Sequence, residues 1–125
     1  MSPPPPLTNA ELALMELLWE QDPLTARQLR EALYPNATRA QHGTVQKLLS
    51  RLEDKGYVTR DRSLSVHLFS ATLGREAYAG GQLESLAEKL TGGSLAPLIT
   101  HLLEEKRIPA DEIARLRAIL DEAPE

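Results

Sequence analysis

The stretch that decides the fold covers residues 44–52 and has the sequence TVQKLLSRL, followed closely by Lys55-Gly56-Tyr57. Its apolar residues recur at positions i, i+3, i+4 and i+7, the spacing of one helix face: Val45, Leu48, Leu49 and Leu52. We expect this face to pack inward. The helix is expected to begin between residues 38 and 41 and to run to Lys55, with Gly56 just past its end.

The opposite face of the same helix is polar. Thr44, Lys47 and Arg51 follow one another at i, i+3 and i+7, with Gln41 one turn earlier. A hydroxyl, an amide and two long cations on one exposed face can reach base edges and phosphates together. This pattern indicates a helix that recognises the major groove of DNA.

Two shorter helices are expected before this one. Residues 8–11 (TNAE) and 25–28 (TARQ) each match the capping box, in which Thr caps the helix and Glu or Gln returns a hydrogen bond. Trp19 falls on the apolar stripe of the first helix, and we expect it in the core.

After Gly56 the sequence changes from helical to strand periodicity. Residues 57–60 (YVTR) and 66–69 (VHLF) are rich in β-forming side chains and are separated by polar residues. Three helices followed by a short hairpin is the order of the winged helix-turn-helix, in which the third helix contacts DNA.

The last third of the chain is again helical. One helix is expected to contain Ala77 and Leu90, to be interrupted at Gly80-Gly81 and to end at Gly92-Gly93. Ser94 is expected to cap the next helix, and Pro109 to open the last. Three short amphipathic helices can hardly bury their apolar faces alone, so we expect a partner subunit to cover them. The residues expected at this dimer interface are Leu83, Leu86, Leu90, Leu95, Leu98, Ile99, Leu102, Leu103, Ile113, Leu116, Ile119 and Leu120.

The predicted fold class is therefore mainly α with a small β-hairpin wing. We expect a disordered proline-rich lead-in at residues 1–6, a winged-helix domain at 7–71 and a three-helix dimerisation module at 72–125.

Composition narrows the function. The 125 residues include no cysteine, which excludes disulfides and thiolate chemistry and suits the cytoplasm. No apolar run approaches the ~18 residues of a membrane span. No phosphate loop, nucleophile elbow or carboxylate pair is recognisable, so we expect no enzyme and no cofactor. His101, Glu104 and Glu105 share one helix face but lack further ligands, so no metal site is expected.

The net charge of −4 hides a local basic segment. Residues 38–62 hold six basic and three acidic side chains, whereas the segments on either side are acidic. Phosphate binding depends on the local patch, because charges beyond a Debye length of ~8 Å are screened. The predicted DNA-contacting residues are Arg39, Gln41, His42, Thr44, Lys47, Arg51, Lys55, Arg60 and Arg62.

Several motifs in order along residues 7–122 resemble the BlaI/MecI/CopY repressors, which are the penicillinase and methicillin-resistance repressors and their copper-responsive relatives. The motifs are LTNAE (7–11), MELLW (15–19), PLTARQL (23–29), TVQKLLSRL (44–52), KGY (55–57), and the C-terminal segments 94–95, 102–105 and 112–121. The resemblance implies a homodimeric repressor on a pseudo-palindromic operator, with one recognition helix in each half-site.

The chain departs from the family pattern at four places. Without cysteine, the copper-binding mechanism is excluded. His101-Leu102 stands where the antibiotic-responsive branch has the Asn-Phe bond that is cleaved after a membrane sensor-protease responds, which argues against that partner. Leu64-Ser65 replaces a Gly-Arg wing tip, and Ala40 replaces an aromatic residue before the recognition helix.

Some alternatives stay open from sequence alone. Gln41 fits a cap partner of Thr38 as well as a base contact, and Thr44 can bond to its own helix. Lys55, Arg60 and Arg62 fit phosphate contacts or plain surface positions. Two other functions compete with the repressor: a winged-helix module for protein interaction, and a regulator that senses a small effector.

Overall fold

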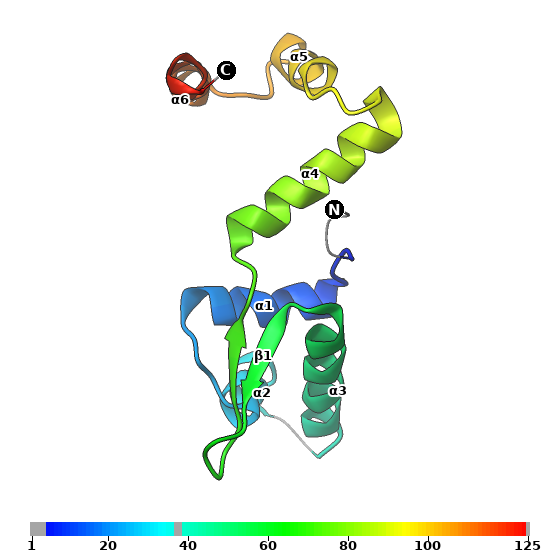
Figure 1. The fold of residues 1–125 in the computed structure, drawn as a ribbon, viewed down its shortest axis with the longest axis vertical. Helices are drawn as coiled ribbons and strands as arrows, with labels where there is room; N and C mark the ends of the chain where they lie inside the picture. Colours follow the sequence, from blue (N-terminus) through cyan, green and yellow to red (C-terminus); the bar gives the residue numbers. More distant parts are fainter. Residues whose placement is uncertain (1–4, 37–38, 125) are drawn as a thin grey trace. The chain divides into compact units, whose positions relative to one another are not determined.

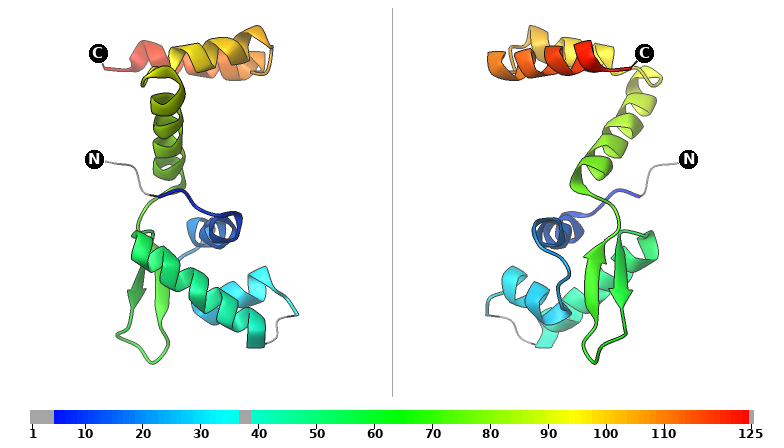
Figure 2. Two further views of the ribbon diagram at one scale, coloured as in Figure 1. Left: turned by 90° about the vertical axis from the view of Figure 1, so that its right-hand side faces the viewer. Right: turned by 60° about the vertical axis from the view of Figure 1, so that its left-hand side comes forward.

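The computed structural model describes residues 5–36 and 39–124, with the backbone alone for Arg39. It divides into two compact units, the first ending at Gln82 and the second beginning at Leu83. Figures 1 and 2 show the elements in chain order. They are α1 (Asn9–Glu20), α2 (Ala26–Leu33), α3 (Arg39–Lys55), β1 (Val58–Asp61), β2 (Leu68–Ala71), α4 (Arg75–Thr91), α5 (Ala96–Glu104) and α6 (Ala110–Glu122).

Both predicted capping boxes are confirmed. The Thr8 hydroxyl accepts from the Glu11 amide at 3.2 Å, and the Glu11 carboxylate accepts from the Thr8 amide at 2.9 Å. Thr25 and Gln28 repeat the arrangement at 3.1 and 2.8 Å. Each box satisfies backbone donors that would otherwise lack partners, so both helices begin at fixed residues.

The core of the first unit is built where α1, α2 and α3 meet the hairpin (Figure 2). The predicted inward face of α3 is confirmed, because all four of its apolar residues are buried. The buried apolar side chains of the core are Leu14, Met15, Leu18, Leu29, Val45, Leu48, Leu49, Leu52, Tyr57, Val58 and Phe69. Trp19 is half-buried against this core.

The end of α3 is closed as the sequence predicts. Gly56 has a φ of +85°, the left-handed conformation that glycine adopts without strain. The Gly56 amide donates to Glu53 at 3.1 Å and the Tyr57 amide to Leu52 at 2.8 Å. This pattern satisfies the last carbonyl groups of the helix and turns the chain into β1.

The hairpin is present, shifted along the chain from its predicted position. β1 and β2 pair antiparallel, with Val58 opposite Ala71 and Arg60 opposite Phe69. Phe69 also forms a bridge with Leu24, which fixes β2 from its other side. The predicted second strand began at Val66, but that residue is outside the strand and exposed. The winged helix-turn-helix fold is confirmed.

Two predictions about the helices that follow the hairpin are wrong. α4 runs through Gly80-Gly81 without interruption, because its flanking turns are good helix formers and each glycine costs only ~1 kcal/mol. Ser94 does not cap α5, whose N-cap is Leu95. With Ser94 as the cap, Pro97 would occupy the third position of the helix, where it has no N–H to donate.

The first turns of α4 belong to the first unit, past the boundary predicted after residue 71. Trp19 Nε1 donates to the Leu73 carbonyl at 2.8 Å, and its ring lies 6.2 Å from that of Tyr78. Arg75 pairs with Glu16 at 2.9 Å. The start of α4 is therefore held against α1 by polar and aromatic contacts.

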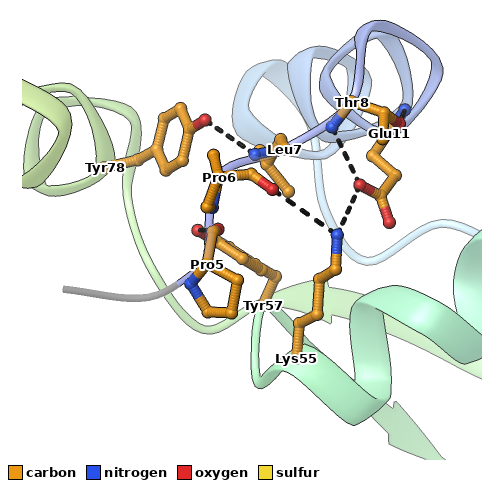
Figure 3. Close-up of polar contacts among 8 residues, drawn as sticks. All are labelled: Pro5, Pro6, Leu7, Thr8, Glu11, Lys55, Tyr57 and Tyr78. Carbon is orange, nitrogen blue, oxygen red and sulfur yellow. Dashed lines mark hydrogen bonds and ion pairs between the residues drawn. The ribbon is translucent and has the colours of Figure 1, made fainter. Parts of the chain in front are cut away.

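The proline segment before α1 is also held, as far as it is described. The Pro5 carbonyl accepts a hydrogen bond from the Tyr57 hydroxyl, and the Leu7 amide donates to the Tyr78 hydroxyl at 2.9 Å (Figure 3). The expectation of disorder does not hold for Pro5 and Pro6, while residues 1–4 lie outside the described residues. Among the described helices, none is both long and apolar enough to cross a lipid bilayer.

Candidate nucleic-acid interface

The exposed face of α3 carries the residues predicted to meet DNA. Thr44, Lys47 and Arg51 are all exposed on it. The Thr44 hydroxyl donates to the Ala40 carbonyl at 3.1 Å, which is the bond to its own helix left open by the sequence. The residue is nevertheless exposed, so this bond leaves it at the surface.

Two neighbouring side chains on this face were missed by the sequence analysis. Gln46 and Ser50 are exposed and, with Lys47 and Arg51, line one shallow hollow along α3. The signal was present, because Gly43, Gln46 and Ser50 repeat the i, i+3, i+7 spacing of the predicted face one residue earlier. The polar face is therefore wider than a single stripe, and it includes an amide that can read a base edge.

A second hollow, of about 340 Å³, lies between the start of α2, the first turns of α3 and the wing. Gln46 lines it too, so the two hollows meet at this side chain. His42 lines the second hollow, and its Nε2 lies 3.5 Å from Gln46 Nε2. The remaining lining residues include Arg27, Arg60 and His67.

Two predicted positions at the start of α3 are less defined. Gln41 is half-buried and already makes an interaction. Its proposed cap partner, Thr38, and the side chain of Arg39 lie outside the described residues.

The predicted cations divide into two groups. Lys47 and Arg51 form no ion pair with any described residue. Lys55, Arg60 and Arg62 each lie against a carboxylate of the same unit. Among the predicted cations whose side chains the structure describes, Lys47 and Arg51 alone have no acidic partner, so their charge is available to a phosphate.

Lys55 is engaged on the far end of α3 (Figure 3). Its Nζ donates to Glu11 Oε1 at 2.8 Å and to the Pro6 carbonyl at 3.5 Å. The Glu11 side chain is 0% exposed and that of Lys55 is 27% exposed. Burial raises the pKa of Glu11, but the hydrogen bonds from Lys55 and Thr8 together lower it by more than burial raises it. The pKa therefore lies below its ordinary value.

The wing arginines share one acidic partner. Arg60 lies 3.1 Å from Glu53 Oε1, and Arg62 lies 3.5 Å from Glu53 Oε2. The Arg60 guanidinium also stacks 4.8 Å from the centroid of the Phe69 ring. At the tip, a hydrogen bond from the Ser63 side chain lowers the pKa of Asp61, and the Ser63 amide lies 2.9 Å from Asp61 Oδ1.

The second unit leaves most of its predicted interface residues exposed in a single chain. An apolar groove of about 240 Å³ lies between α5 and α6 and is lined by Ile99, Leu103, Ile113, Leu116, Arg117 and Leu120. Leu103 is 43% and Leu120 is 73% exposed. Ala87 of α4 is buried within this unit.

The fold is that of the winged helix-turn-helix class. The solution structure of the DNA-binding domain of the repressor BlaI matches with a TM-score of 0.50 and 20% identity, covering 62% of this chain and 94% of that domain. This likeness concerns the fold.

Sequence comparison gives the family. The family model described as penicillinase repressor matches residues 7–122. The penicillinase repressor of Bacillus licheniformis is 24% identical over 118 residues, which cover 94% of this chain and 91% of that protein. An uncharacterised protein of Latilactobacillus sakei is 23% identical over 91% of this chain and 77% of its own length. The chain belongs to the penicillinase repressor family, and it is a transcriptional regulator and not an enzyme.

Proposed function

We propose that the protein represses transcription as a homodimer, with α3 of each copy in the major groove of one half of a pseudo-palindromic operator. The observation that carries this proposal is the exposed polar face of α3. Lys47 and Arg51 stand there without ion-pair partners among the described residues, beside Gln46 and Ser50. Free cations supply phosphate affinity, and an amide supplies base recognition.

Lys55 and Arg60 are assigned smaller parts than the sequence analysis gave them. Both already have carboxylate partners, and Arg60 is only 15% exposed. Thr44, Lys47 and Arg51, with Gln46 added, form the proposed contact set. Gln41, His42 and Arg39 lie toward the start of the same helix and are retained as candidates.

The homodimer is proposed to form through the second unit. Several apolar side chains of α5 and α6 are 40–73% exposed. Together they expose more apolar surface than a soluble monomer usually leaves in one patch. A second copy brings an identical surface, so a two-fold interface can bury both grooves at once. The predicted set from Leu83 to Leu120 supplies this interface.

Relief of repression by cleavage at His101-Leu102 is not proposed. This bond lies inside α5, and the residue pair differs from the Asn-Phe of the antibiotic-responsive branch. Cleavage there would require local unfolding of the helix.

The DNA proposal is tested by selecting duplexes from a random pool with the full-length protein, then measuring anisotropy over a range of salt concentrations. Lys47→Ala is expected to weaken binding and to lower the salt slope by about 1 per protomer, because one cation of each copy no longer meets a phosphate. Lys89→Ala, an exposed cation of α4, is the matched control and should change neither. If no duplex is enriched and none is bound at low salt, the proposal fails, and this result favours the alternative of a protein-interaction module.

The dimer proposal is tested by sedimentation equilibrium. Leu103→Glu places a charge in the groove and is expected to yield monomers. Leu64→Glu changes a leucine that is 59% exposed at the wing, outside this surface, and should leave the dimer intact. A wild-type protein that sediments as a monomer at micromolar concentration contradicts the proposal.

A further inference from the structure

We infer that Glu53 is a specificity-determining residue, because it holds the two wing arginines in ion pairs and so limits binding to DNA that lacks the operator sequence. The inference rests on the proposed function. It concerns a residue that neither the sequence pattern nor the family description places at the DNA.

The geometry is that of one carboxylate shared by two guanidinium groups. Glu53 lies in the last turns of α3, and its two oxygens face Arg60 and Arg62 separately, at 3.1 and 3.5 Å. The Glu53 side chain is 29% exposed, so the partner of both arginines is itself partly withdrawn from water. Among the described residues of the wing between Val58 and Ala71, these two are the lysine or arginine side chains.

The two arginines are held to different degrees. Arg60 is 15% exposed, stacked on Phe69 and paired at the shorter distance, so it is fixed in the structure. Arg62 is 60% exposed and paired at 3.5 Å, a type of surface pair that contributes little to stability. Arg62 can therefore turn to a phosphate, but the Glu53 charge stays beside it and opposes the approach of DNA.

The consequence is larger for non-operator DNA. Non-specific binding depends almost wholly on cations that meet phosphates, since it has no base contacts. On the operator, the base contacts of α3 fix the orientation of the protein on the DNA. A freed wing arginine can then pair only with a phosphate that lies within its reach in that one orientation. On other sequences the protein can bind in many orientations, and a freed cation adds to each of them. Glu53 thus raises the ratio of operator to non-operator affinity.

The test compares Glu53→Gln with Asp54→Asn in the full-length protein. Both substitutions remove one negative charge from the end of α3, but Asp54 is exposed and forms no ion pair within the described residues. Binding is measured on the selected operator and on a scrambled duplex of equal length, from about 0.05 to about 0.3 M salt, the range over which phosphate binding weakens most.

Glu53→Gln is expected to tighten binding to the scrambled duplex about 5-fold per protomer near 0.15 M salt, and to steepen the salt slope by about 0.9 per arginine freed. The gain on the operator is expected to be smaller, so the specificity ratio falls. Adding Arg62→Ser to Glu53→Gln should cancel most of the gain. Asp54→Asn should change affinity less than about 2-fold with an unaltered slope.

Three results would overturn the inference: Glu53→Gln behaving like Asp54→Asn, equal gains on both duplexes, or a gain that survives Arg62→Ser. Glu53→Ala removes the hydrogen-bond acceptors as well, and it should show the same direction provided that its thermal melt is cooperative. A wild-type protein that binds neither duplex refutes the proposed function itself. This outcome differs from the three above, in which the wild-type protein still binds the operator.

Discussion

Replacing Lys55 with methionine separates two roles that this side chain could have. Lys55 lies in the basic segment and was predicted to contact DNA, whereas its ammonium lies 2.8 Å from the carboxylate of Glu11. Methionine keeps most of the apolar stem and removes the charge. The structure predicts a loss of stability and little change in DNA binding.

The size of this loss follows from burial. Glu11 is 0% exposed, and its second oxygen, Oε2, is buried without a hydrogen-bond partner among the described residues. Removing one member of a buried pair costs about 3–5 kcal/mol, and the partial exposure of Lys55 places this pair at the lower end or slightly below, about 2–3 kcal/mol. In a unit of this size, 1 kcal/mol shifts the melting temperature by about 4–8 °C, so we expect a drop of about 10–20 °C.

The assay is thermal unfolding followed by circular dichroism, with the salt dependence of operator binding measured well below the transition. Lys47→Met makes the same change on the exposed face of α3, and is expected to alter stability by less than about 0.5 kcal/mol while lowering the salt slope. Adding Glu11→Gln to Lys55→Met should restore most of the stability, because a neutral glutamine still serves the capping box. An unchanged melting temperature together with a reduced salt slope for Lys55→Met would refute this reasoning.

Other predictions follow from single residues. Stability should fall as the pH drops below the ordinary Glu11 pKa of 4.5, because this pKa is lowered in the folded state and the contribution of the carboxylate is lost as the pH falls through the lowered pKa. The melting temperature, measured from about pH 5 to about pH 3, should therefore depend less on pH in Glu11→Gln than in the wild type. Burial raises the pKa of Tyr57 to about 12, so its contribution is present below pH 10 and is lost as the pH rises from 10 toward 12, a decline that Tyr57→Phe should remove in alkaline melts. Gly56→Ala should destabilise the protein by about 1 kcal/mol or more, since φ is +85° there, and Gly43→Ala inside α3 should stabilise it by up to about 1 kcal/mol; urea unfolding of both variants checks the opposite signs.

The features that the sequence predicted well depend on neighbours along the chain. Each capping box joins residues three apart, and the inward face of α3 repeats within a few turns, so local spacing defines them. The left-handed Gly56 belongs to the same class, because the glycine that ends a helix is read from adjacent residues. The hairpin was predicted with its strands displaced, since β-propensity favoured Val66, whereas pairing with Thr59 and Val58 of β1 extends the second strand to Ser70 and Ala71.

The features that the sequence could not supply join residues far apart. Glu11 and Lys55 are 44 positions apart, and no periodicity connects them. Arg60 and Arg62 pair with Glu53 because the chain turns back beside α3 after Gly56. Lys55 and these two arginines therefore have acidic partners that Lys47 and Arg51 lack, a difference that the sequence does not indicate. The interruption expected at Gly80-Gly81 was predicted from the helix propensity of glycine alone. In the structure α4 continues through these residues, because helix formation is cooperative and the turns on both sides are helical.

The central claim, that the exposed face of α3 lies in the major groove, is tested most directly by cleavage of DNA from a tethered iron chelate. The chain has no cysteine, so Ser50→Cys creates a unique attachment point on that face. On the selected operator, hydroxyl radicals from this position should cut each half-site within the major groove, giving two clusters related by the operator's symmetry. A chelate at Glu20→Cys, exposed at the end of α1, should give no such pattern. Cutting from Glu20→Cys but not from Ser50→Cys would contradict the assignment of α3 as the recognition helix.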